Sequence, residues 1–140
     1  MTTPSETLLD ILSDLNNSSI DIQASAIISN EGLVMAALID KNLDEDRVAA
    51  MTIAISAQAN RVVREIHLGK LQQVLIKGQQ GYAIIISAGE QAVLTIMLKA
   101  SAQLGFIFLS CARSAKKIAA TGIAKPSPRH GLVYLGKRKR

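Results

Sequence analysis

The chain has 140 residues, of which 49% are hydrophobic, 3% aromatic and 19% charged, and its formal net charge is +5. This length predicts one domain with an aliphatic core, and the scarcity of aromatic residues argues against a nucleic-acid surface built on base stacking. Residues 123–140 carry six basic and no acidic side chains, so residues 1–122 have a net charge of −1. We therefore expect a nearly neutral domain, residues 1–122, followed by a basic tail, residues 123–140.

The targeting signals that a sequence can carry are not evident in this chain. Cys111 is the only cysteine, which excludes a disulfide within the chain and fits a reducing compartment. The first residues do not place a basic segment before an apolar one, as a signal peptide would. The longest uncharged apolar runs are far shorter than the roughly 20 residues that span a bilayer. We expect a cytoplasmic protein.

The first elements predicted are a helix and a hairpin. The segment TPSE at residues 3–6 reads as a capping box with proline at the first helical position, and aliphatic residues follow at helical spacing up to Leu15. Residues 21–29 alternate as a strand does, and residues 33–39 return as a second strand. The turn between them, at residues 30–32, predicts a hairpin in which glycine supplies a positive φ.

The stretch from Asp44 to Leu68 is predicted as one helix of about seven turns. Its first residues are acidic, and Arg64 and His67 lie near its end, as the helix dipole favours. Gly69 follows and is expected to end the helix in a left-handed conformation.

Apolar and small side chains occupy two adjacent stripes of this helix, which is more than one buried face requires. We expect the first stripe to lie on the chain's own sheet. It contains Val48, Met51, Ile55, Ala59, Val62 and Ile66. The second stripe is built mostly of small residues that would let another backbone approach, and we expect it to contact another chain. It contains Ala49, Ile53, Ser56, Asn60 and Val63.

Three strands and a helix are predicted after Gly69. Residues 70–77 include glutamines and terminal lysines, which are typical of an edge strand. Residues 82–88 and 92–98 are apolar on both faces, so they should lie centrally in a sheet that is covered on both sides. The last helix should begin at residue 101 or 102 and end at Gly122. Its inward stripe is predicted to contain Leu104, Ile107, Phe108, Cys111, Ala115 and Ile118.

The order of these elements predicts the fold class. Because every link between consecutive strands is short, the five-stranded sheet should be largely antiparallel. Two strands that are apolar on both faces require helices on both faces of that sheet. We therefore expect an α/β, or α+β, three-layer sandwich.

These elements and their sequences resemble the Roadblock/dynein light-chain family over about residues 5–121. The hairpin ASAIISNEGLVMAALI is similar to the family's hairpin, in which apolar strands flank an Asp/Asn-x-x-Gly corner. The alanine-rich helix that ends in REIHLG, the strand LQQVLIKGQQG and the pair YAIIISAGEQAVLTIML are also similar. The tail, residues 123–140, lies outside the family pattern.

The resemblance implies a profilin-like fold and a homodimer. In the family, the third strands of two subunits pair edge to edge and the long helices pack side by side. This would place eight residues in the dimer interface: Ala49, Ile53, Ser56, Asn60, Val63, Leu71, Gln73 and Leu75. We expect a partner protein to bind first at the rim beyond the second stripe. That rim carries Ala57, Arg61 and Arg64.

The resemblance also implies a function without chemistry, cofactor or small-molecule substrate. Family members bind small Ras-like GTPases or act as light chains in motor and signalling complexes. The bacterial gliding-motility members stimulate GTP hydrolysis by reshaping their partner GTPase, without inserting an arginine finger. This behaviour disfavours a finger role for Arg61 or Arg64, and solvated helix charges are the simpler interpretation.

The residues that could carry chemistry have simpler interpretations too. His67 has no Cys or His at ligand spacing, so we expect a helix-end residue rather than a metal ligand. Cys111 lies on the predicted buried stripe and should be a packed small residue. The glycines near residues 69, 78 and 81 do not form a Walker motif, so any GTPase would have to be another chain.

The tail offers two further hypotheses. Its four terminal charges could contact anionic lipid or nucleic acid, although such a run is more often a solvated chain end, and nucleic acid is not expected as a partner. These charges are Lys137, Arg138, Lys139 and Arg140. The apolar segment HGLVYLG, residues 130–136, could add as a strand to a free sheet edge.

Two functions are consistent with these observations. The first is a homodimeric, non-catalytic regulator that binds a small Ras-like GTPase and modulates its GTP hydrolysis or localisation. The alternative is a structural scaffold, or light-chain-like subunit, with no effect on GTP turnover. A small-ligand sensor ranks last, because strands that are apolar on both faces leave no polar groups to orient a ligand.

Overall fold

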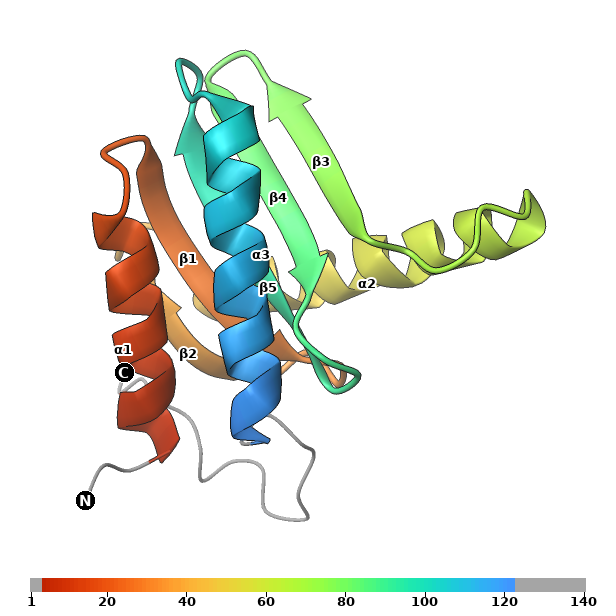
Figure 1. Cartoon of the computed structure of the whole chain (residues 1–140), viewed down its shortest axis with the longest axis horizontal. Coiled ribbons are helices and arrows are strands. Elements are labelled where there is room, and N and C mark those ends of the chain that lie inside the picture. Colours follow the sequence, from red (N-terminus) through yellow and green to blue (C-terminus); the bar gives the residue numbers. More distant parts are fainter. Residues whose placement is uncertain (1–3, 123–140) are drawn as a thin grey trace.

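A computed structural model of the protein describes residues 4–122, in which three helices and five strands follow in the predicted order (Figure 1). The N-terminal half contains α1 (Pro4–Asn17), β1 (Ile22–Ser29), β2 (Val34–Leu38) and α2 (Glu45–Glu65). The C-terminal half contains β3 (Gln73–Gly78), β4 (Gly81–Ser87), β5 (Ala92–Lys99) and α3 (Leu104–Thr121).

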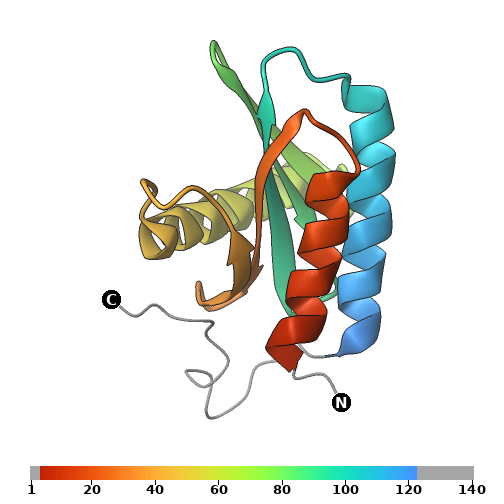
Figure 2. The same cartoon turned by 90° about the vertical axis from the view of Figure 1, so that its left-hand side faces the viewer.

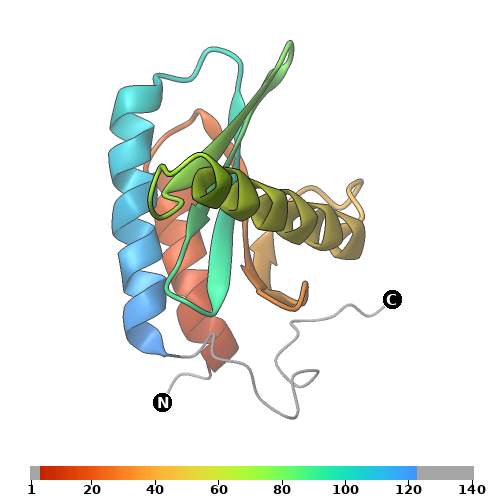
Figure 3. The ribbon, with the colours of Figure 1, turned by 90° about the vertical axis from the view of Figure 1, so that its right-hand side faces the viewer.

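The five strands form one sheet in the order β2-β1-β5-β4-β3, and every neighbouring pair is antiparallel. α1 and α3 lie side by side on one face of the sheet, and α2 crosses the other face (Figures 2 and 3). This confirms the predicted three-layer α+β sandwich with a largely antiparallel sheet. β3 is an edge strand, as its lysines and glutamines predicted, and β4 and β5 lie inside the sheet.

The larger core lies between the sheet and the layer of α1 and α3. Leu8 and Leu12 of α1 have no exposed surface and pack with Ile107 of α3 and with Ile84 and Leu94 of the sheet. Each such side chain stabilises the fold by roughly 1.5–3 kcal/mol when fully buried. The predicted inward stripe of the last helix is confirmed, because its six members are either buried or packed against this core.

One polar pair also ties α1 to the sheet. The Ser25 hydroxyl, which is fully buried in β1, donates a hydrogen bond to Oδ1 of Asn16 at 2.7 Å. A buried hydroxyl without such an acceptor would destabilise the fold, so this bond helps to position the end of α1 over β1.

A smaller core lies under α2, and it reverses the predicted roles of the two stripes. Ala49 has no exposed surface and packs with Ile28, Ile85 and Val93 of the sheet. The second stripe therefore contacts the chain's own sheet through Ala49 and Ile53, although its Asn60 is exposed. Met51, in the first stripe, is 52% exposed, so the prediction that the first stripe covers the sheet is wrong.

The physical reason lies in the sheet beneath α2. Its inner face is already filled by Ile28, Ile85 and Val93. Only small side chains such as Ala49 and Ser56 fit between these residues and a closely packed helix. The longer aliphatic side chains of the first stripe are therefore displaced to one side of α2.

α2 ends in a Schellman motif centred on His67 rather than at the predicted Gly69. The His67 N–H donates to the Arg64 carbonyl at 3.3 Å. The Leu68 N–H donates to the Val63 carbonyl at 2.7 Å, which completes the motif. His67 takes the left-handed position with φ 60°, which is uncommon for a residue with a side chain. Gly69 also has a positive φ, but it lies two residues beyond His67.

Two other helix ends agree with the sequence. Asp44 precedes α2, and its Oδ1 accepts a hydrogen bond from the Arg47 backbone N–H at 3.2 Å. Gly122 ends α3 in the left-handed conformation with φ 67°. One strand boundary differs by more than one residue, since β3 begins at Gln73 and leaves residues 70–72 in the preceding loop.

The turn between β3 and β4 supplies a stability test. A Cβ added to Gly81 would clash with the Leu98 carbonyl oxygen in β5, so Gly81→Ala should lower the free energy of unfolding by about 1–3 kcal/mol. Gly78 is the matched control, because a Cβ there would lie 3.7 Å from its nearest neighbour, the Gly81 oxygen. Gly78→Ala should change the stability by less than about 0.5 kcal/mol. Urea unfolding followed by circular dichroism measures both, and equal losses would contradict the prediction.

Candidate partner-binding surfaces

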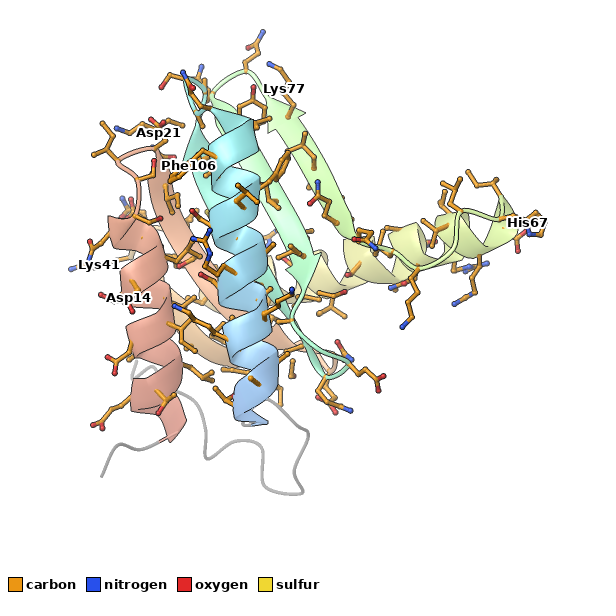
Figure 4. All side chains as sticks on the ribbon, in the orientation of Figure 1. Asp14, Asp21, Lys41, His67, Lys77 and Phe106 are labelled. Atoms are coloured by element: carbon orange, nitrogen blue, oxygen red, sulfur yellow. The ribbon has the colours of Figure 1, made fainter. Side chains whose placement is uncertain are left out.

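The C-terminal half of α2 extends past the edge of the sheet (Figure 1), and His67 lies at its far tip (Figure 4). The apolar side chains of this overhang are largely exposed, with Val62 at 53%, Ile66 at 57% and Leu68 at 64%. Within residues 4–122, the buried residues of α2 are Ala49, Thr52 and Ser56. The overhang therefore exposes apolar surface that is not part of the core of a single chain.

One side of α2 carries a row of exposed aliphatic side chains, which we call the apolar flank. It consists of Met51, Ile55, Val62 and Ile66, each between 38% and 57% exposed. β3, the last strand of the sheet in the described part of the chain, also has exposed apolar side chains, since Leu75 is 43% and Ile76 40% exposed. Exposed apolar side chains, and a strand edge that is unpaired within the described residues, are each typical of an interaction site.

The opposite side of α2 forms one wall of a groove with a volume of about 770 Å³. Its apolar part includes Ile53, Val63 and Val93, and Arg64 and Glu90 bring charges of opposite sign to it. The remaining lining comes from α2, the loop at residues 69–71, the turn between β4 and β5, and Asn30. The lining of the groove is therefore mixed, partly apolar and partly polar.

Hydrogen bonds hold together the two turns beside this groove. The Asn30 side-chain amide donates to the Glu90 carbonyl at 2.6 Å, and the Asn30 backbone N–H donates to the Gln91 carbonyl at 3.0 Å. Asn30 and Glu90 are 60 residues apart in the chain. No local sequence pattern indicates this contact, so the sequence analysis did not identify the groove.

The groove combines residues that the sequence analysis assigned to two different surfaces. Five of them were expected in the dimer interface: Ile53, Ser56, Asn60, Val63 and Leu71. Ala57 and Arg64, expected at the partner-binding rim, also line it. Arg61 is exposed on α2 but does not line the groove.

The other residues expected at the dimer interface lie apart from the groove. Gln73 and Leu75 are exposed on β3, where a second strand could reach them. Ala49 has no exposed surface and contacts its own sheet rather than another subunit. The tail charges at residues 137–140 lie outside the described residues.

The described residues do not bring reactive groups together. Among residues 4–122, no cluster of three or more His, Cys, Asp or Glu side chains could hold a metal ion. Cys111 is buried, and burial raises the pKa of its thiol to about 12. None of the helices in the described part of the chain is long and apolar enough to cross a membrane.

Comparison with known proteins identifies the family of this chain. The model of the Roadblock/LC7 domain matches residues 8–98, which run from α1 to the end of β5 and include α2 and β3. The chain belongs to the Roadblock/LC7 family. Three uncharacterized proteins of Methanocaldococcus jannaschii are each 34% identical to it. One of them aligns over 110 residues, which is 79% of this chain and 95% of that protein.

Solved structures share the Roadblock/LC7 fold at lower identity. The gliding protein MglB of Thermus thermophilus is 20% identical, with a TM-score of 0.76 over 89% of this chain and 93% of that one. LokiProfilin1, solved in complex with rabbit actin, is 16% identical, with a TM-score of 0.57 over 84% of this chain and 97% of that one. The fold is therefore of the Roadblock and profilin-like type.

The buried thiol gives a prediction about reactivity and pH. A thiol reacts as its thiolate, so Cys111 should not react with Ellman's reagent near neutral pH until urea unfolds the protein. Its folded pKa of about 12 lies above the ordinary value of 9.0, so its contribution to stability is complete below pH 9.0 and is lost as the pH rises toward 12. Rapid labelling of the folded protein near neutral pH would contradict this assignment.

Proposed function

We propose that this Roadblock/LC7 protein is a homodimeric, non-catalytic regulator that binds a small Ras-like GTPase and modulates its GTP hydrolysis or localisation. The observation that carries this proposal is that α2 is exposed on both sides of its buried residues, Ala49, Thr52 and Ser56. One side presents the apolar flank, and the other presents the groove. A helix with two such sides can contact a second subunit and a partner protein at once.

The dimer part of the proposal uses the edge of β3 together with the apolar flank. Within residues 4–122, β3 pairs only with β4, so its other edge has backbone groups that a second β3 could pair with. A twofold axis beside that edge would continue the sheet and bring the overhanging halves of two α2 helices together. We therefore assign the helix contact to the flank of Met51, Ile55, Val62 and Ile66, in place of the second stripe, which contacts the sheet and lines the groove.

Burial of the apolar flank would supply a free energy comparable with the cost of forming this dimer. The exposed half of each flank side chain would contribute on the order of 1 kcal/mol when buried. Four such residues from each subunit give about 8 kcal/mol, which is comparable with the cost of association, about 4–15 kcal/mol. The backbone hydrogen bonds between paired β3 strands would add to this.

The partner-binding part of the proposal uses the groove and the rim beside it. Arg64 and Lys70 bring positive charge to the partly apolar groove, which Glu90 also lines, and Arg61 lies outside it on the same helix. Arginine beside apolar surface is a frequent anchor of protein interfaces. The family membership and the fold shared with MglB support a GTPase as the partner.

The dimer is tested by a charge on the apolar flank. Val62→Asp should convert the dimer into a monomer, because burying an unpaired carboxylate between two helices is strongly unfavourable. Gln58→Asp is the matched control, since Gln58 is exposed on the same helix and lies outside the flank and the groove. Light scattering coupled to size exclusion gives the mass, and a dimeric Val62→Asp protein would exclude this interface.

The partner is tested with the small Ras-like GTPases encoded in the same genome as this chain, each loaded with GDP or a non-hydrolysable GTP analogue. We expect one of them to bind in a nucleotide-dependent manner, and Arg64→Ala to weaken that binding by about tenfold or more. Arg47→Ala is the matched control, because Arg47 is exposed on α2 away from the groove. Interferometry measures binding, and phosphate release measures GTP turnover.

Two results would reject the regulatory proposal in different ways. Binding that ignores the nucleotide and leaves GTP turnover and localisation unchanged would favour the scaffold alternative. Failure of every GTPase in the panel to bind would remove GTPases as partners altogether.

A further inference from the structure

The solvent side of α3 carries a row of exposed side chains, which we call the outer line of α3. Its first half is apolar, with Phe106 and Leu109 at 59% and 61% exposure. Its second half is basic and consists of Arg113, Lys116 and Lys117, all of them exposed. At about 100° of rotation per residue, these five side chains fall within about a third of the helix circumference. A single flat partner could therefore contact all of them at once.

The chain as a whole separates its charges in the same sense. Residues 91–140 contain ten basic and no acidic side chains, whereas all eleven acidic side chains lie in residues 1–90. α3 holds three of the ten basic residues, and residues 123–140 hold six. That tail begins directly after Gly122, at the end of α3 that carries Lys116 and Lys117. The basic half of the outer line is therefore continued in sequence by a tail of the same charge.

The cations of the outer line are not neutralised within the described part of the chain. In residues 4–122, none of the three has an ion-pair partner within 4.0 Å. The exposed acidic side chains of the same layer belong to α1 and are Glu6, Asp10 and Asp14. Figure 4 shows Asp14 projecting from the side of α1 that faces away from α3. Glu90 lines a small pocket with Ala119, which lies off the outer line. An anionic partner would therefore meet α3 rather than the whole layer.

The apolar half of the outer line lies at an end of the layer where a further apolar side chain is exposed. Ile20, in the turn after α1, is 85% exposed. The turn after α1 and the start of α3 lie at the same end of the layer (Figures 1 and 2), and Phe106 lies there too (Figure 4). Transfer of such side chains from water into an apolar environment is favourable. The surface therefore suits a partner that offers both an apolar phase and negative charge.

We propose that the outer line of α3 docks, together with the basic tail, on an anionic lipid bilayer. Phe106 and Leu109 would enter the boundary between headgroups and acyl chains, and the three cations would lie at the level of the lipid phosphates. The outer line extends over about 16 Å of helix, a length over which a bilayer is flat. A nucleic acid would match only the cations, because its phosphate backbone offers no apolar phase to Leu109 and Ile20.

The charges set the expected strength of this contact. Each lysine or arginine close to an anionic leaflet strengthens binding on the order of fivefold. The three cations of α3 would therefore give a weak, reversible contact that the apolar side chains and the tail strengthen. Stable attachment to a membrane commonly needs two such signals, one apolar and one basic.

The membrane contact does not depend on the proposed dimer or on a GTPase. It uses the face of the sheet opposite α2 (Figure 3). In the proposed dimer, paired β3 strands would continue the sheet, so both α3 helices would lie on one side of it and both α2 helices on the other. Two outer lines on one side would bind the same membrane more tightly than one. The face with α2 would then point away from the lipid.

Cosedimentation of the full chain with lipid vesicles tests the proposal without any GTPase, so its outcome is separate from that of the GTPase experiment. We expect the chain to pellet with phosphatidylcholine vesicles that contain phosphatidylserine and to stay in solution with pure phosphatidylcholine vesicles. Binding should be lost at about 1 M salt, where the Debye length falls to about 3 Å. Failure to bind the phosphatidylserine vesicles at low salt would overturn the proposal.

Charge reversal locates the contact on α3. Lys116→Glu/Lys117→Glu should weaken vesicle binding at least tenfold. The control Lys41→Glu/Arg47→Glu has the same change in net charge, but Lys41 is exposed in the loop before α2 and Arg47 within α2. Equal losses in the two variants would reject α3 as the site. If reversed charges prevent folding, Lys116→Gln/Lys117→Gln replaces them, and undiminished binding of that variant would also contradict the proposal.

A tryptophan on the outer line reports whether its apolar half reaches the lipid. The chain contains no tryptophan, so Leu109→Trp introduces a single fluorophore at an exposed position. We expect its emission to shift to shorter wavelength when phosphatidylserine vesicles are added, whereas the emission of Gln58→Trp, exposed on α2, should not shift. Vesicle binding without a shift at position 109 would leave the tail as the only membrane contact and overturn the assignment to α3.

The competing partner is a nucleic acid, and the same variants distinguish it. Wild-type chain that binds double-stranded DNA or RNA but no vesicles, and loses that binding in Lys116→Glu/Lys117→Glu, would assign the outer line to nucleic acid and overturn the proposal. Removal of residues 137–140 should weaken vesicle binding at least tenfold. Undiminished binding of the shortened chain would remove the tail from the proposed contact.

Discussion

The packing of small side chains of α2 on an apolar sheet is the contact on which the rest of the structure depends. Ala49 has no exposed surface, and Ile28, Ile85 and Val93 fill the face of the sheet beneath it. A helix can lie this close to such a sheet only where its side chains are small. This contact determines the rotation of α2 about its axis, and therefore which of its sides meet solvent.

The rotation of α2 explains why one helix presents two different surfaces. The long aliphatic side chains, among them Met51 and Val62, are displaced to the apolar flank. The other side faces the turn between β4 and β5 and forms the groove that Arg64 and Glu90 line. Neither surface holds reactive groups in the described part of the chain, so both are better suited to contacts with proteins than to chemistry.

The sheet separates these surfaces from the layer of α1 and α3. That layer is anchored by a deep core around Leu8, Leu12 and Ile107, while its outer side is patterned only by charge and by a few exposed apolar residues. In the proposed dimer, the face with α2 would contact a second subunit and receive a partner protein, whereas the outer layer of α1 and α3 would take no part in that contact. A three-layer fold allows this division because each face of the sheet carries its own helices.

Local sequence patterns by themselves determined most of the fold. Alternation and apolar runs located the strands, short links made the sheet antiparallel, and the single apolar side of α3 left only one way to orient that helix. Asp44 and Gly122 marked helix ends because their chemistry acts on neighbouring residues. The tertiary structure alone decided the orientation of α2, since both stripes are apolar and periodicity does not reveal which one has a filled sheet beneath it. The tertiary structure also forms the groove, because the hydrogen bond between Asn30 and Glu90 joins segments that no local sequence pattern connects.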